Sequence, residues 1–162
     1  MKKRNILITG TTGGIGEAIV HKVLNKFSRI YIHYNKNITK AEKLQHLILS
    51  NGGESYLLKA DLSDESEVNN FAKTIKDEVG VIDVLINNAG GVIVSKQLPD
   101  YTEDDFKKIF NLNFYSAFRL CQEVFPAMCN KQYGRIINIS SIGVKFGGGK
   151  QTFLYSAAKS SL

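Results

Sequence analysis

Two residues near the C-terminus have the types and spacing of an acid–base pair. Tyr155 and Lys159 stand four residues apart in YSAAK, so on a helix they share one face. An ammonium beside a phenol favours the phenolate and lowers the tyrosine pKa, which makes the phenol a usable acid near neutral pH. Such pairs also occur as solvated surface. Ser140 and Ser141, which follow a β-rich run, add hydroxyls suited to holding a carbonyl oxygen.

A glycine-rich turn near the N-terminus has the composition of a phosphate-binding loop. TGTTGGIG (9–16) fits the spacing T-G-x-x-x-G-x-G, and Gly13 lets it fit T-G-x-x-G-x-x-G as well, whereas G-x-G-x-x-G is not met. Glycines permit a tight turn and let the backbone approach a pyrophosphate at a helix N-terminus. Because the motif lies between a β-rich run and a helical pattern, we interpret it as a dinucleotide-binding turn rather than a simple turn.

A third motif, NNAG (87–90), ends the fourth β-rich run. Its small residues would let a nucleotide lie against the backbone, while the amide side chains fix the loop. An ordinary Asn/Gly turn is the alternative.

These motifs need a scaffold, and short β-rich runs alternate with helical patterns along the chain. The expected strands are Arg4–Thr9, Arg29–Tyr34, Ser55–Lys59, Ile82–Ile86 and Gly134–Ile139. The expected helices are Gly14–Lys26, Thr39–Ser50, Asp64–Val79 and Thr102–Lys131. The alternation predicts an α/β fold: a doubly wound, Rossmann-like parallel sheet in the strand order 3-2-1-4-5, covered on both faces.

Local signals support several helix ends. Thr102 and Asp105 form a capping-box pattern, and Gly52-Gly53 and Gly80 are expected to end the second and third helices. Pro126 lies inside the last helical pattern, so we expect that segment to kink or divide there.

Open parallel sheets bind ligands beyond the carboxyl ends of their strands. The glycine turn, Asp61-Leu62, NNAG and Ser141 each follow an expected strand directly. The candidate residues therefore converge on one edge of the sheet.

Composition bounds the class of protein. The 162 residues are 43% hydrophobic and 22% charged, which predicts one folded domain over residues 1–162. The 21 Lys and Arg exceed the 15 Asp and Glu, for a net charge of +6. We interpret this excess as solvated surface, with a phosphate-bearing cofactor or an acidic carrier as the functional alternative. The basic residues show no interleaved aromatics, so nucleic acid is not an expected partner.

The N-terminal segment and the cysteines predict the cellular compartment of the protein. The opening MKKRNILITG resembles a signal peptide, but its apolar stretch is too short for a signal core, and no later run could span a membrane. Cys121 and Cys129 lie eight residues apart in one expected helix, beyond bridging distance, so both are expected to be buried free thiols of a cytoplasmic protein. Three histidines lack metal-ligand spacing and are interpreted as structural, with no metal expected: His21, His33 and His46.

Together the motifs resemble the short-chain dehydrogenase/reductase family. The matching segments cover nearly the whole chain: TGTTGGIG, Asp61-Leu62, NNAG, Asn113 in NLNFYSAF, ISS (139–141) and YSAAK. The arrangement is most similar to bacterial 3-oxoacyl-acyl-carrier-protein reductases and related carbonyl reductases. GIG and NNAG favour this branch over the extended sugar-nucleotide epimerases.

The resemblance implies a carbonyl reductase of fatty-acid metabolism acting on a small or carrier-bound ketone. Tyr155 would give a proton to the substrate oxygen as hydride arrives from a nicotinamide, and Lys159 would lower the tyrosine pKa and hold the nicotinamide ribose. Ser141 would polarise the carbonyl, and Asn113 would hold a water joining Lys159 to solvent. The cofactor-binding residues implied are Gly10, Thr11, Thr12, Gly14, Ile15, Gly16, Tyr34, Asn35, Lys36, Asp61, Leu62, Asn88, Ala89, Gly90, Tyr155 and Lys159.

The choice between two serines stays open. Ser141 lies 14 residues before Tyr155, one more than in many relatives, and Ser140 is adjacent. Ser141 is preferred because relatives usually use the second position. The extra residue is assigned to Lys145–Lys150, expected to be a flexible loop that could contact substrate, with its lysines otherwise solvated charges.

The choice of dinucleotide depends on the end of the second strand. NAD-specific relatives carry an Asp there, but this sequence has Tyr34, Asn35 and Lys36. The missing acid removes repulsion against a 2′-phosphate, and Lys36 would attract one. Gly13 stands where many NADP-users carry Arg, which leaves NAD(H) as the alternative to the favoured NADP(H).

The element count predicts an incomplete fold. A complete doubly wound dinucleotide fold has six or more strands, whereas five are expected here. We therefore expect C-terminal truncation and weak or no turnover, from a protein whose relatives form dimers or tetramers through the helices containing Asn113 and Tyr155. The alternative is a non-catalytic dinucleotide-binding protein of the same fold. A third hypothesis, a partner-binding scaffold, has only the net charge in its favour.

Overall fold

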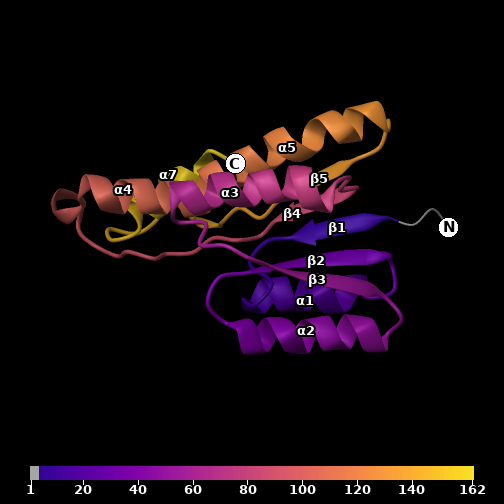
Figure 1. Cartoon of the computed structure of the whole chain (residues 1–162). Helices are drawn as coiled ribbons and strands as arrows, with labels where there is room; N and C mark the ends of the chain where they lie inside the picture. The colour runs from indigo at the N-terminus through magenta and orange to yellow at the C-terminus, as the bar shows by residue number, and fades with distance from the viewer. Residues whose placement is uncertain (1–3) are drawn as a thin grey trace.

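The computed structural model describes residues 4–162, and its centre is a five-stranded parallel sheet between two layers of helices (Figure 1). The strand order is β3-β2-β1-β4-β5, which confirms the predicted 3-2-1-4-5 arrangement. The strands are β1 (Asn5–Ile8), β2 (Arg29–Tyr34), β3 (Glu54–Lys59), β4 (Val84–Asn87) and β5 (Arg135–Asn138). Two of the three basic residues that open the chain lie outside the described residues.

The helices divide between the two faces of the sheet. One face is covered by α1 (Gly14–Val23) and α2 (Ile38–Ser50). The other is covered by α3 (Glu65–Thr74), its π-helical continuation η1 (Ile75–Val79) and α5 (Ser116–Asn130). Toward the carboxyl ends of the strands lie η2 (Leu98–Asp100), α4 (Glu103–Phe110), η3 (Asn111–Tyr115), α6 (Gly143–Phe146) and α7 (Phe153–Ser160).

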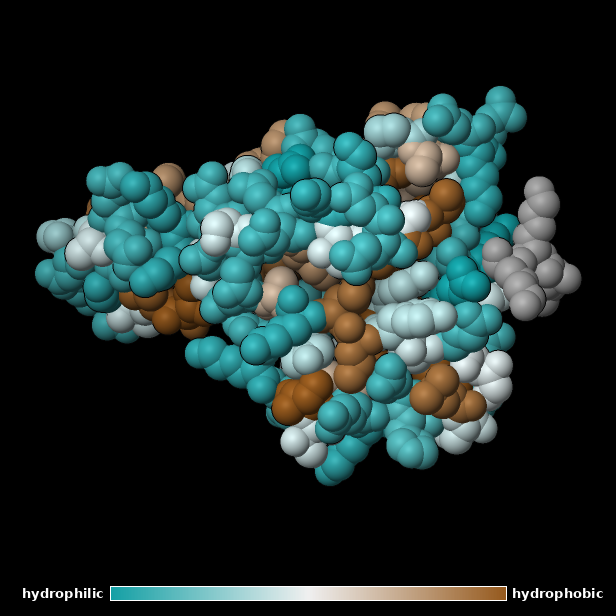
Figure 2. Space-filling view, in the orientation of Figure 1, coloured by the Kyte–Doolittle hydropathy of each residue, from teal (hydrophilic) through white to brown (hydrophobic). Residues whose placement is uncertain are grey.

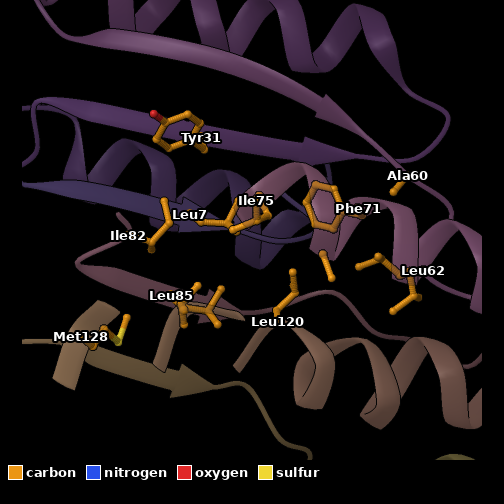
Figure 3. Close-up of a cluster of buried hydrophobic side chains, with 13 residues drawn as sticks. Leu7, Tyr31, Ala60, Leu62, Phe71, Ile75, Ile82, Leu85, Leu120 and Met128 are labelled. Atoms are coloured by element: carbon orange, nitrogen blue, oxygen red, sulfur yellow. The ribbon is translucent and has the colours of Figure 1, made fainter. Parts of the chain in front are cut away.

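Alternation along the strands produces two separate cores. On β1, Leu7 points toward α3 and α5, where it packs with Phe71 and Leu120 (Figure 3). Its neighbours Ile6 and Ile8 point to the opposite face and pack in a second core with residues of α1 and α2. Because both faces are covered, the strands are apolar almost throughout, as the sequence pattern predicts.

The sheet register brings distant motifs together. Ile8 of β1 pairs with Ile86 of β4, so the glycine turn and NNAG leave the sheet side by side. The carboxyl ends of the strands point toward α4 and α7 (Figure 1).

The predicted helix ends are confirmed except at Pro126. Thr102 and Asp105 form a complete capping box, and Gly52 and Gly80 follow their helices with φ of 80° and 77°. The expected division at Pro126 is wrong, because α5 runs through that residue and the segment changes geometry earlier, at η3. Pro126 and Gln122 are both exposed, so water can satisfy the carbonyl that loses its partner.

The expectation for the cysteines holds in part. Both thiols are free and both lie on α5, but Cys121 is half-buried and Cys129 is exposed. Cys129 follows Met128, the last buried residue of the helix, and one residue further turns about 100° round the axis toward solvent. The prediction of two buried thiols is therefore wrong for Cys129.

The surface seen in Figure 2 is hydrophilic over most of the helices, with apolar residues showing between the two helical layers, where the edge strand β3 runs. Within residues 4–162, no helix has the length and apolar character needed to cross a membrane.

Candidate active site

The glycine turn bends sharply between β1 and α1. Gly10 has φ of 67°, a conformation that L side chains rarely adopt, and an added Cβ would lie 2.9 Å from Ala89 Cα. A Cβ on Gly16 would lie 2.3 Å from the carbonyl oxygen of Gly10. A side chain at either position would therefore force the backbone of the turn to shift.

Hydrogen bonds connect the NNAG segment at the end of β4 to this turn. Asn88 Nδ2 donates to the carbonyl oxygens of Thr9 (2.8 Å) and Gly10 (3.1 Å). In return, Thr9 Oγ1 accepts from the backbone N–H of Asn88 (3.0 Å) and of Ala89 (2.9 Å). The amide of Asn88 thus shapes the glycine turn as well as bordering the pocket beside it.

His33, at the end of β2, lies against the same turn. Its Nδ1 accepts from the Gly10 N–H at 3.0 Å, and its Nε2 lies 3.1 Å from the carbonyl oxygen of Ala60. Burial lowers the pKa of His33 to about 4, although the Ala60 carbonyl and the charge of Asp61 act in the opposite direction. The ring is therefore neutral at physiological pH.

A pocket of about 320 Å³ opens at the carboxyl edge of the sheet, between the glycine turn and NNAG. Its position and its small-residue walls fit a dinucleotide, because two of the glycines leave no room for a side chain and the pocket adjoins the start of α1. Thr11 is fully buried, and its hydroxyl donates to the His33 carbonyl, so its side chain does not line the pocket. The lining residues are Gly10, Thr12, Gly13, Gly14, Ile15, Gly16, His33, Asn35, Leu62, Asn88, Ala89, Gly90 and Leu112.

A second hollow, of about 740 Å³, continues from the first at Asn35 and lies across the ends of β2 and β3. Tyr34, Lys36, Lys59 and Asp61 border it. Burial raises the pKa of the Asp61 carboxyl, but hydrogen bonds from Ser63 and Asn35 and the charge of Lys36 outweigh burial and lower the pKa overall.

Lys159 and Asn113 meet at Gly90, on the far side of NNAG from the glycine turn. A Cβ on Gly90 would lie 2.5 Å from Lys159 Nζ and 2.9 Å from Asn113 Oδ1. Lys159 is 4% exposed, and its Nζ donates to the Ile139 carbonyl at 3.0 Å. Burial lowers the pKa of this ammonium. Asn113 is buried and is bonded to both backbone groups of Gly91: its Oδ1 accepts from the N–H, and its Nδ2 donates to the carbonyl.

The two serines after β5 differ in their partners. Ser140 Oγ donates to the Lys159 carbonyl at 3.0 Å, which joins the end of β5 to α7. Ser141 Oγ accepts from the Gly143 N–H at 3.1 Å, and among the described residues its hydroxyl donates to none. Tyr155 lies half-buried on α7, one turn before Lys159.

The structure thus brings two groups of predicted residues together at this edge of the sheet: the glycine turn with NNAG, and Asn113 with Lys159 at Gly90. Within residues 4–162, no side-chain hydrogen bond joins Tyr155 or Ser141 to either group. Three contributions to the site were not predicted from the sequence: Leu112 lines the pocket, Asn35 bonds to Asp61, and His33 bonds to the turn. Strand alternation puts His33 on the same face as Tyr31 at the carboxyl end of β2, and that position was the available signal.

A parallel sheet in this order, with a glycine turn and a pocket at its carboxyl edge, defines a Rossmann-like dinucleotide-binding fold. The family model for short chain dehydrogenase matches residues 4–162. The chain belongs to the short-chain dehydrogenase family.

Individual relatives agree with this assignment. A 3-oxoacyl-acyl-carrier-protein reductase of Synechocystis sp. is 32% identical over 156 residues, which cover 96% of this chain and 62% of that protein. The uncharacterized oxidoreductase YvrD of Bacillus subtilis is 35% identical over 146 residues, 90% of this chain and 54% of that protein. The chain therefore spans a little over half of the length of these curated relatives.

Solved structures show the same fold. The crystal structure of a blue fluorescent protein from a metagenomic library, in complex with NADPH, matches with a TM-score of 0.86 at 29% identity. The match covers 98% of this chain and 64% of that protein's chain. A metagenomic short-chain oxidoreductase in complex with NADP matches with a TM-score of 0.85 at 28% identity. That match covers 98% of this chain and 71% of the oxidoreductase chain.

Proposed function

We propose that this chain carries the cofactor-binding and catalytic residues of an NADP(H)-dependent oxidoreductase that reduces a carbonyl, such as a 3-oxoacyl group, to an alcohol. The observation that supports this most is the meeting of Lys159 and Asn113 at Gly90, directly beside the pocket formed by the glycine turn. When bound, the dinucleotide supplies the hydride.

Each residue of the proposed site has a distinct part. Tyr155 donates the proton that the substrate oxygen needs, and Lys159, one helical turn away, favours its phenolate. Ser141 is the better candidate for holding the carbonyl oxygen, since its hydroxyl hydrogen is uncommitted whereas that of Ser140 goes to the Lys159 carbonyl. Asn113 fixes the loop beside Lys159, and we propose that it also holds the water that relays protons to solvent.

The preference for NADP(H) is supported by charge at the second hollow. Lys36 and Lys59 border it, and none of the ion pairs formed within residues 4–162 uses either one. The end of β2 carries no carboxylate, and Asp61 is already engaged by Ser63 and Asn35. Two carboxylates, Asp61 and Glu67, also border the hollow, but both already accept hydrogen bonds within the protein. The charges that a 2′-phosphate would find without an ion-pair partner there are those of Lys36 and Lys59.

We also propose that the protein forms a homo-oligomer through α4 and α5. These two helices expose Phe106, Phe118 and Phe125, and large exposed apolar groups are typical of an interface. Sedimentation velocity would test the proposal, which a monomer at all concentrations would contradict.

Reduction of a β-ketoester with NADPH tests the catalytic proposal. Tyr155→Phe is expected to lower the rate roughly 100-fold or more, because the proton donor is lost, with NADPH binding retained. Tyr133→Phe is the matched control, since Tyr133 stacks with Arg4 and Arg135 at the opposite end of the sheet and a phenyl ring preserves those contacts. NADPH binding without turnover in the wild type would instead favour a dinucleotide-binding protein of the same fold.

A further inference from the structure

Three hydrogen bonds join His33 to two consecutive residues of the glycine turn. The ring Nδ1 accepts from the N–H of Gly10 at 3.0 Å. The His33 carbonyl accepts from both the N–H and the hydroxyl of Thr11, each at 3.0 Å. The side chain and the backbone of one residue at the end of β2 therefore hold the start of the turn.

The ring can make its contacts in only one protonation state. The Ala60 carbonyl, 3.1 Å from Nε2, can only accept a hydrogen bond, so Nε2 must carry a proton. The Gly10 N–H can only donate, so Nδ1 must be without one. These partners assign His33 to the neutral Nε2–H tautomer.

The surroundings of the ring favour the same state. His33 is 3% exposed, and the ring of Phe71 on α3 packs against it at 5.0 Å between centroids. The glycine turn, residues 9–16, contributes no titratable side chain. The Asp61 carboxylate beyond the end of β3 favours the protonated ring, but burial outweighs it.

The peptide groups of Gly10 explain why this contact matters for the pocket. The N–H of Gly10 is held by His33, while its carbonyl accepts from the Gly13 N–H at 3.2 Å and from Asn88 Nδ2 at 3.1 Å. The positive-φ bend at Gly10 is therefore fixed from two sides. Loss of the His33 acceptor would leave the part-buried N–H of Gly10 without its partner and the bend held from one side only.

We propose that His33 is a positioning residue for the dinucleotide: its unprotonated Nδ1 holds the Gly10 N–H and so maintains the bend that shapes the cofactor pocket. This inference rests on the proposed function for the identity of the ligand. It assigns His33 a role in binding, beyond the packing expected of a core residue.

Two substitutions separate the two ring contacts. In His33→Asn, the amide oxygen occupies the place of Nδ1, so the acceptor for Gly10 is kept and the donor to Ala60 is lost. In His33→Gln, the terminal amide occupies the place of Nε2, so the Ala60 contact is kept and the acceptor for Gly10 is lost. His33→Phe loses both contacts.

The test is NADPH affinity, measured by fluorescence titration of the 162-residue chain and both amide variants after thermal melting has verified their folding. We expect His33→Asn to bind within about threefold of the wild type, and His33→Gln about tenfold or more weakly. Without the acceptor the bend at Gly10 relaxes in the free protein and has to be restored when NADPH binds, and a tenfold loss of affinity corresponds to about 1.4 kcal/mol. Equal affinities in the two variants, or weaker binding by His33→Asn than by His33→Gln, would overturn the positioning role. If His33→Phe does not fold, the comparison of His33→Asn with His33→Gln still tests the positioning role.

The protonation state is measured separately by long-range ¹H–¹⁵N NMR correlation of the His33 ring, with no cofactor present. We expect a bare Nδ1 and a protonated Nε2 at neutral pH, and a protonated Nδ1 would refute the hydrogen bond to Gly10. A wild type that shows the expected tautomer yet does not bind NADPH contradicts the proposed function. A wild type that binds NADPH, with both variants binding equally well, contradicts only the role of His33.

Discussion

The glycine turn contains two neighbouring glycines whose surroundings differ. An added Cβ would lie 2.3 Å from the Gly10 carbonyl oxygen at Gly16, but would meet no atom within 4 Å at Gly14. We expect Gly16→Ala to lower the free energy of unfolding by about 1–3 kcal/mol, as overpacking does, and Gly14→Ala to change it by less than about 1 kcal/mol. Urea denaturation of the two variants measures both. Equal effects would mean that the backbone at Gly16 moves freely.

The buried imidazole of His33 makes stability depend on pH in a definite direction. The folded-state pKa is lowered to about 4, whereas the unfolded chain protonates near pH 6.5. Between these values only the unfolded state takes up the proton, so stability is complete above about pH 6.5 and declines as the pH falls toward 4, by up to about 3 kcal/mol.

His33→Asn removes this titration and gives the comparison that isolates it. Wild type and variant should diverge in stability between pH 6.5 and 4, when urea denaturation is repeated across that range. His21 and His46 are exposed and unchanged in both proteins, so whatever they contribute cancels in the difference. Parallel curves would show that His33 is accessible to protons in the folded state.

Residues with a fixed local role were predictable from sequence, and those whose role depends on a distant partner were not. Gly10 and Gly16 were identified from the spacing of the glycine turn, and Gly90 from the NNAG motif together with the family resemblance. Ser140 differs from Ser141 because its hydroxyl bonds to the Lys159 carbonyl of α7, 19 residues further along the chain. The role of His33 depends on Gly10, 23 residues earlier, and no local pattern encodes that contact.

At the scale of elements, the π-helical segment η3 is the joint between α4 and α5. Asn113 in this segment makes three hydrogen bonds, two with Gly91 and one to the Ile109 carbonyl. Asn111, two residues earlier, makes one bond, to the Ser63 carbonyl at 3.2 Å. The wider turn of η3 thus coincides with the side chain that connects this helical layer to the NNAG loop.

These two asparagines form a matched pair for mutation. We expect Asn113→Ala to destabilise the protein by about 2–4 kcal/mol, because a buried side chain that makes three hydrogen bonds is removed and both backbone groups of Gly91 lose their partners, and Asn111→Ala by about 1 kcal/mol or less. Chemical denaturation measures both free energies. If the two losses were similar, water would have to be replacing the Asn113 amide.

The elements themselves followed closely from the sequence. Apolar runs, the capping box at Thr102 and the glycines after two helices predicted the strands and most helix ends, because these signals act within a few residues. The helix geometry was predicted wrongly at the two places where solvent or tertiary contacts determine it. Pro126 is tolerated because it faces water, and η3 widens beside a side chain whose partners lie about 22 residues away.

Across the whole molecule, the cofactor hollows combine glycine walls with two cations. At 100 times its Kd a ligand stabilises its protein by about 2.7 kcal/mol, which corresponds to roughly 5–10 °C in Tm for a chain of this size. We expect NADPH to raise the Tm more than NADH at equal concentration, because Lys36 and Lys59 border the hollow proposed for the 2′-phosphate. Differential scanning fluorimetry measures both shifts.

Salt and one variant provide the controls for that difference. Raising the salt from 0.1 to 1 M shortens the screening length from about 10 to about 3 Å, so the advantage of NADPH should shrink. Lys36→Ala should reduce the NADPH shift and leave the NADH shift unchanged. A larger shift with NADH would contradict the preference for NADP(H).

The pairing of β1 with β4 also sets the order in which the binding site can assemble. Ile6 and Val84 are 78 residues apart in the chain, whereas Ile6 and its other partner, Ile30, are 24 apart. Closing the longer loop costs about 1 kcal/mol more in chain entropy, and contacts between distant residues slow folding. During synthesis, His33 can reach Gly10 long before Asn88 has left the ribosome. The glycine turn is thus held from one side early and completed late, when β4 docks at the centre of the sheet.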